Sequence, residues 1–354
     1  MKICIVGTAI NPIPSNIAWT GIESLCQYLV KGLVELGQEV TLISVEGSLW
    51  KNWDKIELIE IPVKGPDVEQ SFYEGYREYV KGFEGVVHDH SNGKMARLVN
   101  PRTLGTMHWL QTPLAMGYRN VVCISNAHRK WTVAQYPLNL RAEGRGPAVV
   151  YNGIDQSMFP LSKDHGEELL FFSVLGPYKG ADTVLNLALK HPEYRFGFGG
   201  RNTTYSDVVK KAAETHPNIT FYGEVSHDEK KRIMGGAKAL LQLPKPFNRR
   251  DQYPFMDIFP MTIVEANLCG TPVIGLAIDG VAEMIGDGEN GVLCGSVPEV
   301  EVALVGFAGG LVSIPPESCR GYAEKRFSHI RMARDYVNPV SYTHLRAHET
   351  VLDL

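Results

Sequence analysis

Two carboxylates stand close together in the stretch DIFPMTIVEANLCGTPVIG, which runs from residue 257 to residue 275. Asp257 and Glu265 are eight positions apart, and no basic residue lies between them. A carboxylate accepts hydrogen bonds from two hydroxyl groups at once, which suits a vicinal diol such as that of ribose. The pattern therefore favours a nucleotide sugar, with Asp257 toward the sugar and Glu265 on the ribose. A capped helix with a buried acid is the alternative.

The same stretch predicts the start of a helix. Pro260 suits a loop or the first turn of a helix, and the Thr262 side chain can cap that helix. The amides around Met261, Thr262 and Ile263 would then lack partners within the helix and would face an anion. We expect them to hold a diphosphate.

Three further residues follow predicted strands or open a predicted helix. Lys179 lies in the turn PYKG after an apolar strand, where a lysine can clamp a diphosphate. His108 follows the strand TLGTM and can donate to a phosphate or polarise a leaving group. Gly21 opens a helix after a polar loop, where backbone N–H groups can meet an anion. A solvated lysine, a structural histidine and an ordinary strand–helix loop are the respective alternatives.

An alternation of strands and helices must position these residues. Short apolar runs such as KICIV and EVTLIS alternate with amphipathic segments such as residues 21–36. This alternation predicts an α/β fold with parallel sheets. The pattern restarts after residue 155 with LLFFSVLG, so we expect two Rossmann-like domains with a boundary within residues 141–165. Ligands of such sheets bind beyond the carboxyl ends of the strands, where the candidate residues lie.

The composition excludes some classes of protein. The chain has 354 residues, 44% of them hydrophobic and 21% charged, which is typical of a globular protein. A net charge of -4 provides no broad basic field, so we expect no nucleic-acid partner. Six scattered cysteines without a CxxC pair indicate core thiols. No apolar run has the roughly 18 residues of a membrane span. We expect a cytoplasmic protein, and peripheral contact with a membrane stays open.

The C-terminal region has two parts. EKRFSHIRMARDYV, residues 324–337, predicts one helix. Residues 338–354 differ in character and resemble a translated vector sequence, so we interpret them as a non-native tail. His344 and His348 stand four positions apart there, but we expect no metal site.

The chain resembles family 4 glycosyltransferases, which are retaining enzymes of the GT-B architecture. The resemblance rests on segments that follow the family's order over most of the chain: WTGIE (19–23), LVELGQEVTLIS, VVHDHS (86–91), TMHW (106–109), VVYNGID (149–155), PYKG, DIFPMTIVEANLCGTPVIG and DGVAEMIGDGENGVL. Each motif is weak to moderate alone, whereas their order and spacing are specific.

By this resemblance we expect the α/β fold to be GT-B, with two Rossmann-like domains whose parallel sheets face each other across a cleft. Residues 1–153 would form the acceptor-side domain and residues 154–325 the nucleotide-sugar-binding domain. Residues 326–337 would form a helix that packs back toward the N-terminal domain. The implied partners are a nucleotide-diphosphate sugar as donor and a glycan, lipid-linked or small-molecule acceptor. The resemblance implies no metal and no other cofactor.

The resemblance also implies roles for single residues. His108 would assist at the sugar and the leaving group, and Asp257 would hold sugar hydroxyls. Lys179 would neutralise the developing charge of the diphosphate. Gly21 would contribute a backbone N–H, and Glu265 would hold the ribose.

Three positions depart from the family's pattern. Val174 stands where the family has an arginine, so one of two diphosphate cations is missing, and Arg201 is a candidate to replace it. Asp257 stands in place of a glutamate. Pro260 replaces a glycine and removes one N–H beside the diphosphate.

These departures leave other functions open. One alternative is a degenerate member that binds a nucleotide or glycan without turnover, and another is a GT-B sugar-nucleotide epimerase. A Rossmann dehydrogenase is disfavoured because the first loop lacks GxGxxG. The sequence leaves the donor base, the sugar and the acceptor open. The basic and aromatic segment 245–256 either reaches over a substrate or is a solvated loop.

Overall fold

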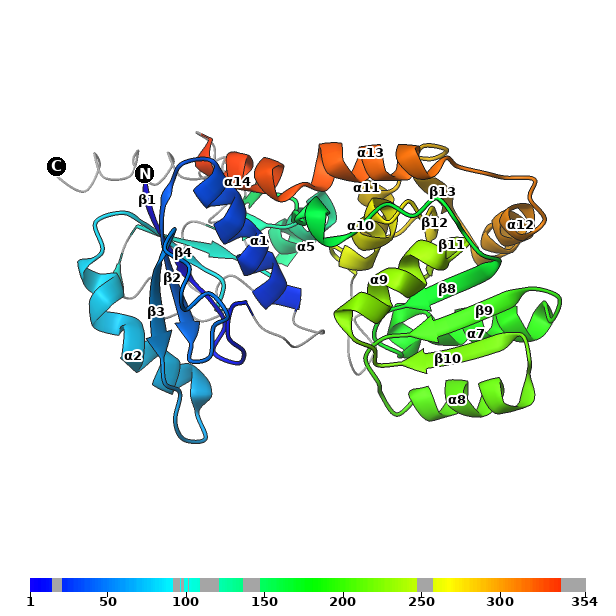
Figure 1. The fold of residues 1–354 in the computed structure, drawn as a ribbon, viewed down its shortest axis with the longest axis horizontal. Coiled ribbons are helices and arrows are strands. Elements are labelled where there is room, and N and C mark those ends of the chain that lie inside the picture. Colours follow the sequence, from blue (N-terminus) through cyan, green and yellow to red (C-terminus); the bar gives the residue numbers. More distant parts are fainter. Residues whose placement is uncertain are drawn as a thin grey trace. The chain divides into compact units, whose positions relative to one another are not determined.

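The computed structural model describes residues 1–14, 21–91, 96, 99, 100, 102–108, 121–135, 147–246 and 257–338 (Figure 1). The chain divides into two compact units. The first comprises Met1–Asp155 together with the described residues from Phe327 onward, and the second is Gln156–Arg326. Each unit has its own sheet and its own core.

The first unit contains a seven-stranded sheet in the order β3-β2-β1-β4-β5-β6-β7, with every pair parallel. Its strands are β1 (Lys2–Val6), β2 (Glu39–Val45), β3 (Glu57–Ile61), β4 (Val86–Asp89), β5 (Thr103–Thr106), β6 (Val121–Cys123) and β7 (Ala148–Val149). Its helices include α1 (Gly21–Glu35), α2 (Val68–Gly82), α5 (Asn126–Gln135) and α14 (His329–Val337).

The second unit contains a six-stranded parallel sheet in the order β10-β9-β8-β11-β12-β13. Its strands are β8 (Glu168–Phe172), β9 (Arg195–Gly199), β10 (Ile219–Gly223), β11 (Ala239–Gln242), β12 (Val273–Leu276) and β13 (Gly291–Cys294). Its helices are α7 (Ala181–Lys190), α8 (Ser206–Thr215), α9 (His227–Gly236), α10 (Met261–Leu268), α11 (Val281–Met284), α12 (Val297–Ala308) and α13 (Pro316–Phe327), with the short 3-10 turns η1 (Gln156–Met158) and η2 (Pro177–Lys179).

Both faces of the second sheet are buried. Leu169 and Phe171 of β8 belong to one core with apolar side chains of α7, α8 and α12. Leu170 and Phe172 point to the opposite face because side chains alternate along a strand, and they are equally buried. A parallel sheet covered by helices on both faces explains why its strands read as continuous apolar runs.

Helix α14 returns the chain to the first unit and packs against α1; Figure 1 shows α14 in red beside α1 in blue. The approach is close at Gly32 of α1, where a Cβ atom would lie 2.7 Å from the carbonyl oxygen of His329 and 2.9 Å from Cβ of Ala333. The absence of a side chain at Gly32 therefore allows α1 and α14 to approach each other this closely.

The structure confirms the α/β class and the two parallel sheets, corrects one local expectation and adds one strand. Residues 324–337 do not form one helix, because Ser328 ends α13 and caps α14, accepting from the amide of Arg331. Strand β13 was not predicted, since its sequence GVLC lies within a glycine-rich segment. The tail 339–354 and most of the segment 245–256 lie outside the described residues.

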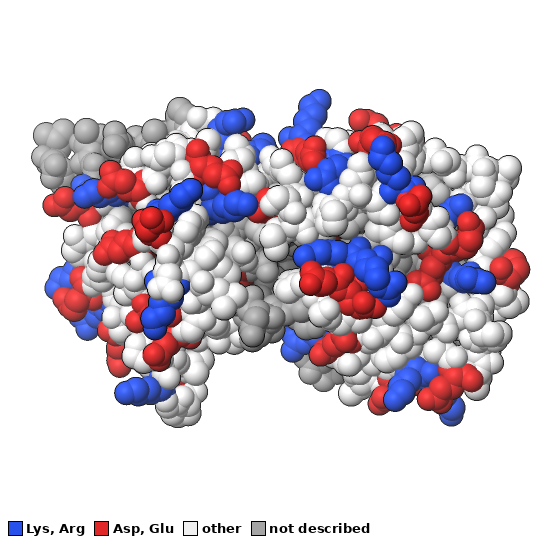
Figure 2. Space-filling view, viewed as in Figure 1, with Lys and Arg blue, Asp and Glu red and all other residues white. Residues whose placement is uncertain are grey.

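The six cysteines are free and buried, as predicted. On the face drawn in Figure 2, Lys and Arg side chains are interspersed with Asp and Glu, which agrees with the small net charge. Within the described part of the chain, no helix is long and apolar enough to cross a bilayer.

Candidate functional site

The strand order places a topological switch point in each sheet. In each sheet the second and third strands lie on one side of the first strand, and the fourth and later strands lie on its other side. This is the doubly wound order 3-2-1-4-5-6, which a seventh strand extends in the first unit. Ligands of such sheets bind at the carboxyl end of the strands flanking this point. In the second unit these strands are β8 and β11, which precede Lys179 and Asp257 respectively.

Lys179 and Asp257 form an ion pair at this switch point. Nζ of Lys179 lies 3.1 Å from Oδ1 of Asp257, and both side chains are largely buried. The other carboxylate oxygen accepts a hydrogen bond of 2.9 Å from Nε2 of Gln242, the last residue of β11. The structure thus brings together two predicted residues and adds a third that sequence reasoning missed.

Asp279 is a second missed residue of this cluster. It follows β12 with φ +47°, a left-handed backbone that Asp tolerates better than most residues. Its Oδ2 accepts from the amide of Asp257 at 3.3 Å, and the carbonyl of Asp257 accepts from the amide of Gly280 at 2.9 Å. Burial raises the pKa of Asp279 to about 6, the Asp257 amide opposes that rise, and the Asp257 charge adds to it.

Helix α10 begins at the predicted place but without the predicted cap. Pro260 is the N-cap residue and makes no side-chain cap bond. The expectation that Thr262 caps the helix is wrong, because Thr262 lies inside α10 and its hydroxyl donates to Oε1 of Gln242 at 3.2 Å. Ile263 donates its amide to Pro260, whereas the amides of Met261 and Thr262 have no acceptor among the described residues.

Glu265 is paired with a lysine that was not among the predicted site residues. Nζ of Lys230 on α9 lies 2.7 Å from Oε1 and 2.6 Å from Oε2 of Glu265, and both side chains are about nine-tenths buried. Lys230 shares the buried face of α9 with Ile233 and Met234, three and four positions on. A lysine that takes a position of the apolar helix face is a sequence signal from which the burial of Lys230 was predictable.

The proposed second cation lies near the same end of the sheet but is exposed. Arg201 follows β9, and its carbonyl accepts from the amide of Leu175 at 2.9 Å. Its charge reaches the phenol of Tyr178 beside Lys179: burial raises the pKa of Tyr178, and Arg201 opposes that rise. Arg201 forms no ion pair with another described residue.

In the first unit, His108 belongs to a cluster of histidines at the ends of β4 and β5. Nε2 of His108 lies 2.9 Å from Nδ1 of His90. The His90 ring packs on His88, with ring centroids 4.1 Å apart, and Nε2 of His88 lies 2.6 Å from Oγ1 of Thr106. Desolvation lowers the pKa of His88 to about 3 and the pKa values of His90 and His108 well below their usual range.

Gly21 is the first residue of α1, two residues before a buried carboxylate. Glu23 accepts from Oγ1 of Thr8 at 2.5 Å and from Nδ2 of Asn11 at 3.3 Å, which ties the first turn of α1 to the loop after β1. A Cβ atom at Gly21 would meet no atom of the described residues within 4 Å. His108 and Gly21 lie in the first unit, whereas the other predicted site residues lie in the second.

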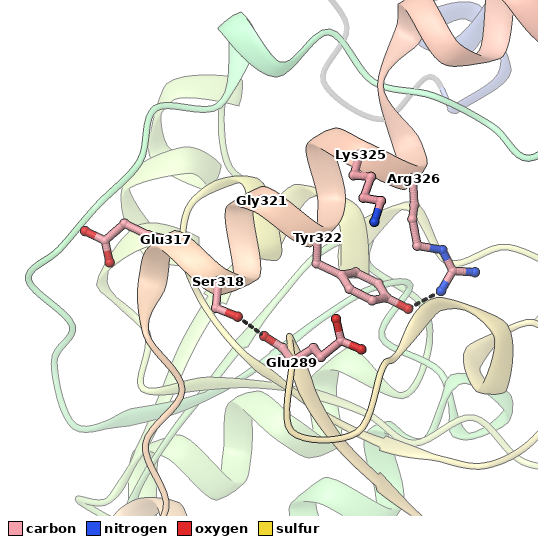
Figure 3. Close-up of a pocket in the computed structure, with 7 residues that line it drawn as sticks. All are labelled: Glu289, Glu317, Ser318, Gly321, Tyr322, Lys325 and Arg326. Atoms are coloured by element: carbon pink, nitrogen blue, oxygen red, sulfur yellow. Dashed lines mark hydrogen bonds between the residues drawn. The ribbon is translucent and has the colours of Figure 1, made fainter.

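The second unit also has a surface pocket of about 400 Å³ (Figure 3). It is lined by Ser318, Tyr322, Lys325 and Arg326 of α13 and by Glu289, among others. Arg326 donates to the Tyr322 hydroxyl, and Ser318 donates to the Glu289 carbonyl at 2.6 Å. None of the predicted site residues lines this pocket. Among the residues that the structure places, no group of three or more His, Cys, Asp or Glu side chains is arranged to hold a metal ion.

One segment of the chain, most of it within the second unit, matches a known family. Residues 154–303 match the family "Glycosyl transferases group 1". The chain is 25% identical over 174 residues to the "Uncharacterized glycosyltransferase MJ1178" of Methanocaldococcus jannaschii. That match covers 49% of this chain and 44% of the relative, so the chain spans less than half the length of the curated relative.

Solved structures share the fold over nearly the whole chain. The chain is similar to AviGT4, a glycosyltransferase involved in avilamycin A biosynthesis, with a TM-score of 0.72, 20% identity and 98% of both chains covered. It is also similar to Anabaena Alr3699/HepE in complex with UDP-glucose, with a TM-score of 0.68, 17% identity, and 96% of this chain and 99% of that one covered. Residues 154–303 therefore match the glycosyl transferases group 1 family, within a chain whose fold is that of the GT-B glycosyltransferases.

Proposed function

We propose that this chain is a retaining, metal-independent glycosyltransferase of family 4. It would move a sugar from a nucleotide-diphosphate sugar to a hydroxyl of a glycan, lipid-linked or small-molecule acceptor, in the assembly of a glycan, glycolipid or polysaccharide. The bond between the anomeric carbon and the diphosphate breaks, and the acceptor oxygen bonds to that carbon on the same face. The proton of the acceptor hydroxyl passes to the departing diphosphate. We expect this reaction in the cytoplasm, and peripheral membrane contact stays a prediction.

The observation that carries the proposal is the cluster at the switch point of the second sheet. The ammonium of Lys179 stands against Asp257, and Gln242 links Asp257 to Thr262 in the first turn of α10. The amides of Met261 and Thr262 have no described acceptor there. A cation and two aligned helix amides would bind a diphosphate and stabilise the charge that it gains as it leaves.

The other predicted residues would act around that diphosphate. Glu265 would accept from the ribose hydroxyls, with Lys230 holding its carboxylate in place. His108 would meet the sugar or the leaving group as a neutral ring. Gly21 would offer its backbone N–H, and Arg201 would add a second cation if its side chain turns toward the diphosphate.

The first experiment is a thermal shift series with UDP, GDP and ADP and with their common sugar conjugates. A ligand that binds the folded state raises the melting temperature with its saturation. UDP-glucose is the first probe, since HepE was solved with it. Uridine and inorganic pyrophosphate separate recognition of the base from recognition of an anion. A shift with one nucleotide identifies the donor class, and no shift with any of them contradicts nucleotide-sugar binding.

Two substitutions then separate binding from transfer. Glu265→Ala should weaken nucleotide-diphosphate binding by about 10- to 100-fold, because hydrogen bonds to a charged group contribute about 1.5–3 kcal/mol. Glu265→Gln is its control, because it retains a partner for Lys230. His108→Ala should leave the affinity for the nucleotide unchanged and lower turnover by about 100-fold or more. Wild-type turnover in both alanine variants would contradict the assignment.

A binding protein without turnover is the second candidate. Val174 in place of an arginine and Pro260 in place of a glycine each remove a diphosphate contact that the family supplies. This candidate predicts a thermal shift with the nucleotide but no product with any acceptor. A GT-B epimerase predicts conversion of the nucleotide sugar without an acceptor, so one assay with and without acceptor distinguishes all three functions.

A further inference from the structure

His90 and His108 are joined directly by their rings. His90 follows β4 and His108 follows β5, and these neighbouring parallel strands end at the same edge of the first sheet. Nδ1 of His90 lies 2.9 Å from Nε2 of His108, and the ring planes are inclined by 28°. The bond is therefore a consequence of strand register and of the two-residue spacing in HDH.

The protons of this pair can be counted. Desolvation lowers the pKa of both rings well below the usual range, and the neighbouring ring lowers it further, so both rings are neutral at neutral pH. A neutral imidazole has one N–H and one bare nitrogen. One proton occupies the shared bond. If Nδ1 of His90 donates, then His108 carries its proton on Nδ1; if Nε2 of His108 donates, then His90 carries its proton on Nε2. Both rings must have the same tautomer.

The two outer nitrogens of the pair have no partner among the described residues. They are Nε2 of His90 and Nδ1 of His108, and both atoms are buried. By the proton count, one of them is a donor and the other is an acceptor. A buried polar atom without a hydrogen bond is costly, so each of these atoms requires a partner from outside the described residues, and an oxygen of a ligand fits that requirement.

His88 belongs to the same cluster, but its Nε2 has a hydrogen-bond partner within the protein. Its Nε2 is bonded to Thr106, whose hydroxyl lies 3.0 Å from the hydroxyl of Tyr336 on α14. Its ring packs on Tyr336, with centroids 4.5 Å apart. His88 is thus tied into the core of the first unit, whereas the outer nitrogens of His90 and His108 are not.

We propose that His90 is a positioning residue that sets the tautomer of His108, so that the two rings act as one hydrogen-bonded unit at the reacting sugar. This inference rests on the proposed function in one respect, namely that His108 meets the substrate. A hydroxyl that donates to Nδ1 of His108 selects the Nε2–H form of both rings. An oxygen that only accepts, such as a phosphate oxygen, selects the Nδ1–H form of both.

The tautomers can be measured without any assay of activity. Histidine labelled with ¹⁵N in the full chain gives nitrogen shifts and couplings that distinguish a protonated from a bare ring nitrogen. His90→Asn and His108→Gln assign the two rings among the eleven histidines. We expect the same tautomer for both rings at pH 7. Opposite tautomers, or a doubly protonated ring, would overturn the proposal.

Two variants of His90 then test its role in transfer. The amide of Asn reaches the position of Nδ1 and can donate or accept, so His90→Asn should retain turnover within about threefold. His90→Leu removes the bond and should lower kcat by about tenfold or more, with the donor KM nearly unchanged. In the labelled protein, His90→Leu should also change the tautomer populations of His108, which a purely structural effect would not do.

The outcomes keep the two proposals separate. Equal kcat in His90→Leu and the wild type would overturn the role of His90, provided that the wild type transfers sugar. Absence of transfer in every variant, the wild type included, would contradict the proposed function, while the nitrogen spectra would still decide whether the rings share a tautomer. His88→Gln, which can retain the bond to Thr106, is a control for the packing of the cluster.

Discussion

At the scale of single residues, the buried pair of Lys230 and Glu265 has the clearest energetic consequence. Lys230→Met should destabilise the second unit by about 3–5 kcal/mol, because it leaves the Glu265 carboxylate buried without a counter-charge. Adding Glu265→Leu should recover most of this loss, since an apolar pair of similar volume is often neutral. Chemical denaturation followed by far-UV circular dichroism measures both changes.

Lys231 provides a matched control on the same helix. It pairs with Asp228, whose side chain is 94% exposed, so Lys231→Met should change the free energy of unfolding by less than about 1 kcal/mol. If Lys230→Met proves as stable as Lys231→Met, the buried pair does not hold α9 to α10 as described.

Asp279 predicts a pH dependence of stability. Its pKa is raised from 3.8 to about 6, so the folded state binds the proton more tightly than the unfolded state does. The favourable contribution is complete below about pH 4 and is lost as the pH rises through about 6. Asp279→Asn should therefore gain stability relative to the wild type between pH 4 and pH 7, by about 1–2 kcal/mol after allowance for partial exposure.

The measurement is the difference between the two unfolding free energies across this pH range. A difference that stays constant across this range would contradict the raised pKa of Asp279. It would reflect only the preference of Asn for the left-handed backbone at φ +47°.

At the scale of elements, the turn η2 depends on a close approach of two backbones. Gly180 has φ +93°, and a Cβ atom there would lie 2.0 Å from the carbonyl oxygen of Leu243. Gly180→Ala should destabilise the second unit and should separate Lys179 from Asp257, weakening nucleotide binding. Gly310 is a control in the same unit, with φ +72° and no atom of the described part of the chain within 4 Å of its Cβ position.

The two glycine variants separate backbone strain from collision. Gly310→Ala should cost about 1–2 kcal/mol for the left-handed backbone alone. Gly180→Ala should cost roughly 1–3 kcal/mol more, because a carbonyl group cannot move aside as a flexible side chain can. Equal costs in thermal or chemical denaturation would show that the turn adapts to the added carbon.

At the scale of the whole molecule, the chain leaves the first unit after Asp155 and returns to it at Phe327. Helix α14 buries Met332, Ala333 and Tyr336, so a chain that ends at Ser328 should have a destabilised first unit. Each large apolar side chain contributes about 1.5–3 kcal/mol when buried. A chain that ends at Asn338 retains α14 and is the matched control.

Tryptophan fluorescence reports the first unit selectively, since all five tryptophans lie within the first 155 residues. We expect an earlier fluorescence transition in the shorter chain than in the chain that ends at Asn338. Coincident transitions in the two chains would contradict a stabilising role of α14 in the first unit.

The sequence by itself determined the class of fold and most of its elements. Periodicity is a local property, so β1, α1 and α7 were predictable from the spacing of their apolar residues. The carboxyl ends of strands were also predictable, which placed Lys179, Asp257 and His108 at the edges of sheets. Local patterns were misleading at Ser328, where a cap interrupts continuous helical spacing, and at Thr262, where Pro260 takes the N-cap position.

Only the tertiary structure decided which side chains meet. Lys230 and Glu265 are 35 positions apart, and Gln242 and Asp257 are 15 apart, so no local pattern links them. The bond between His90 and His108 depends on the register of β4 against β5, which places ring nitrogens 18 positions apart at 2.9 Å. Such pairs depend on how strands align within a sheet and on how helices pack against it, because burial then selects a partner for each polar side chain that it removes from water.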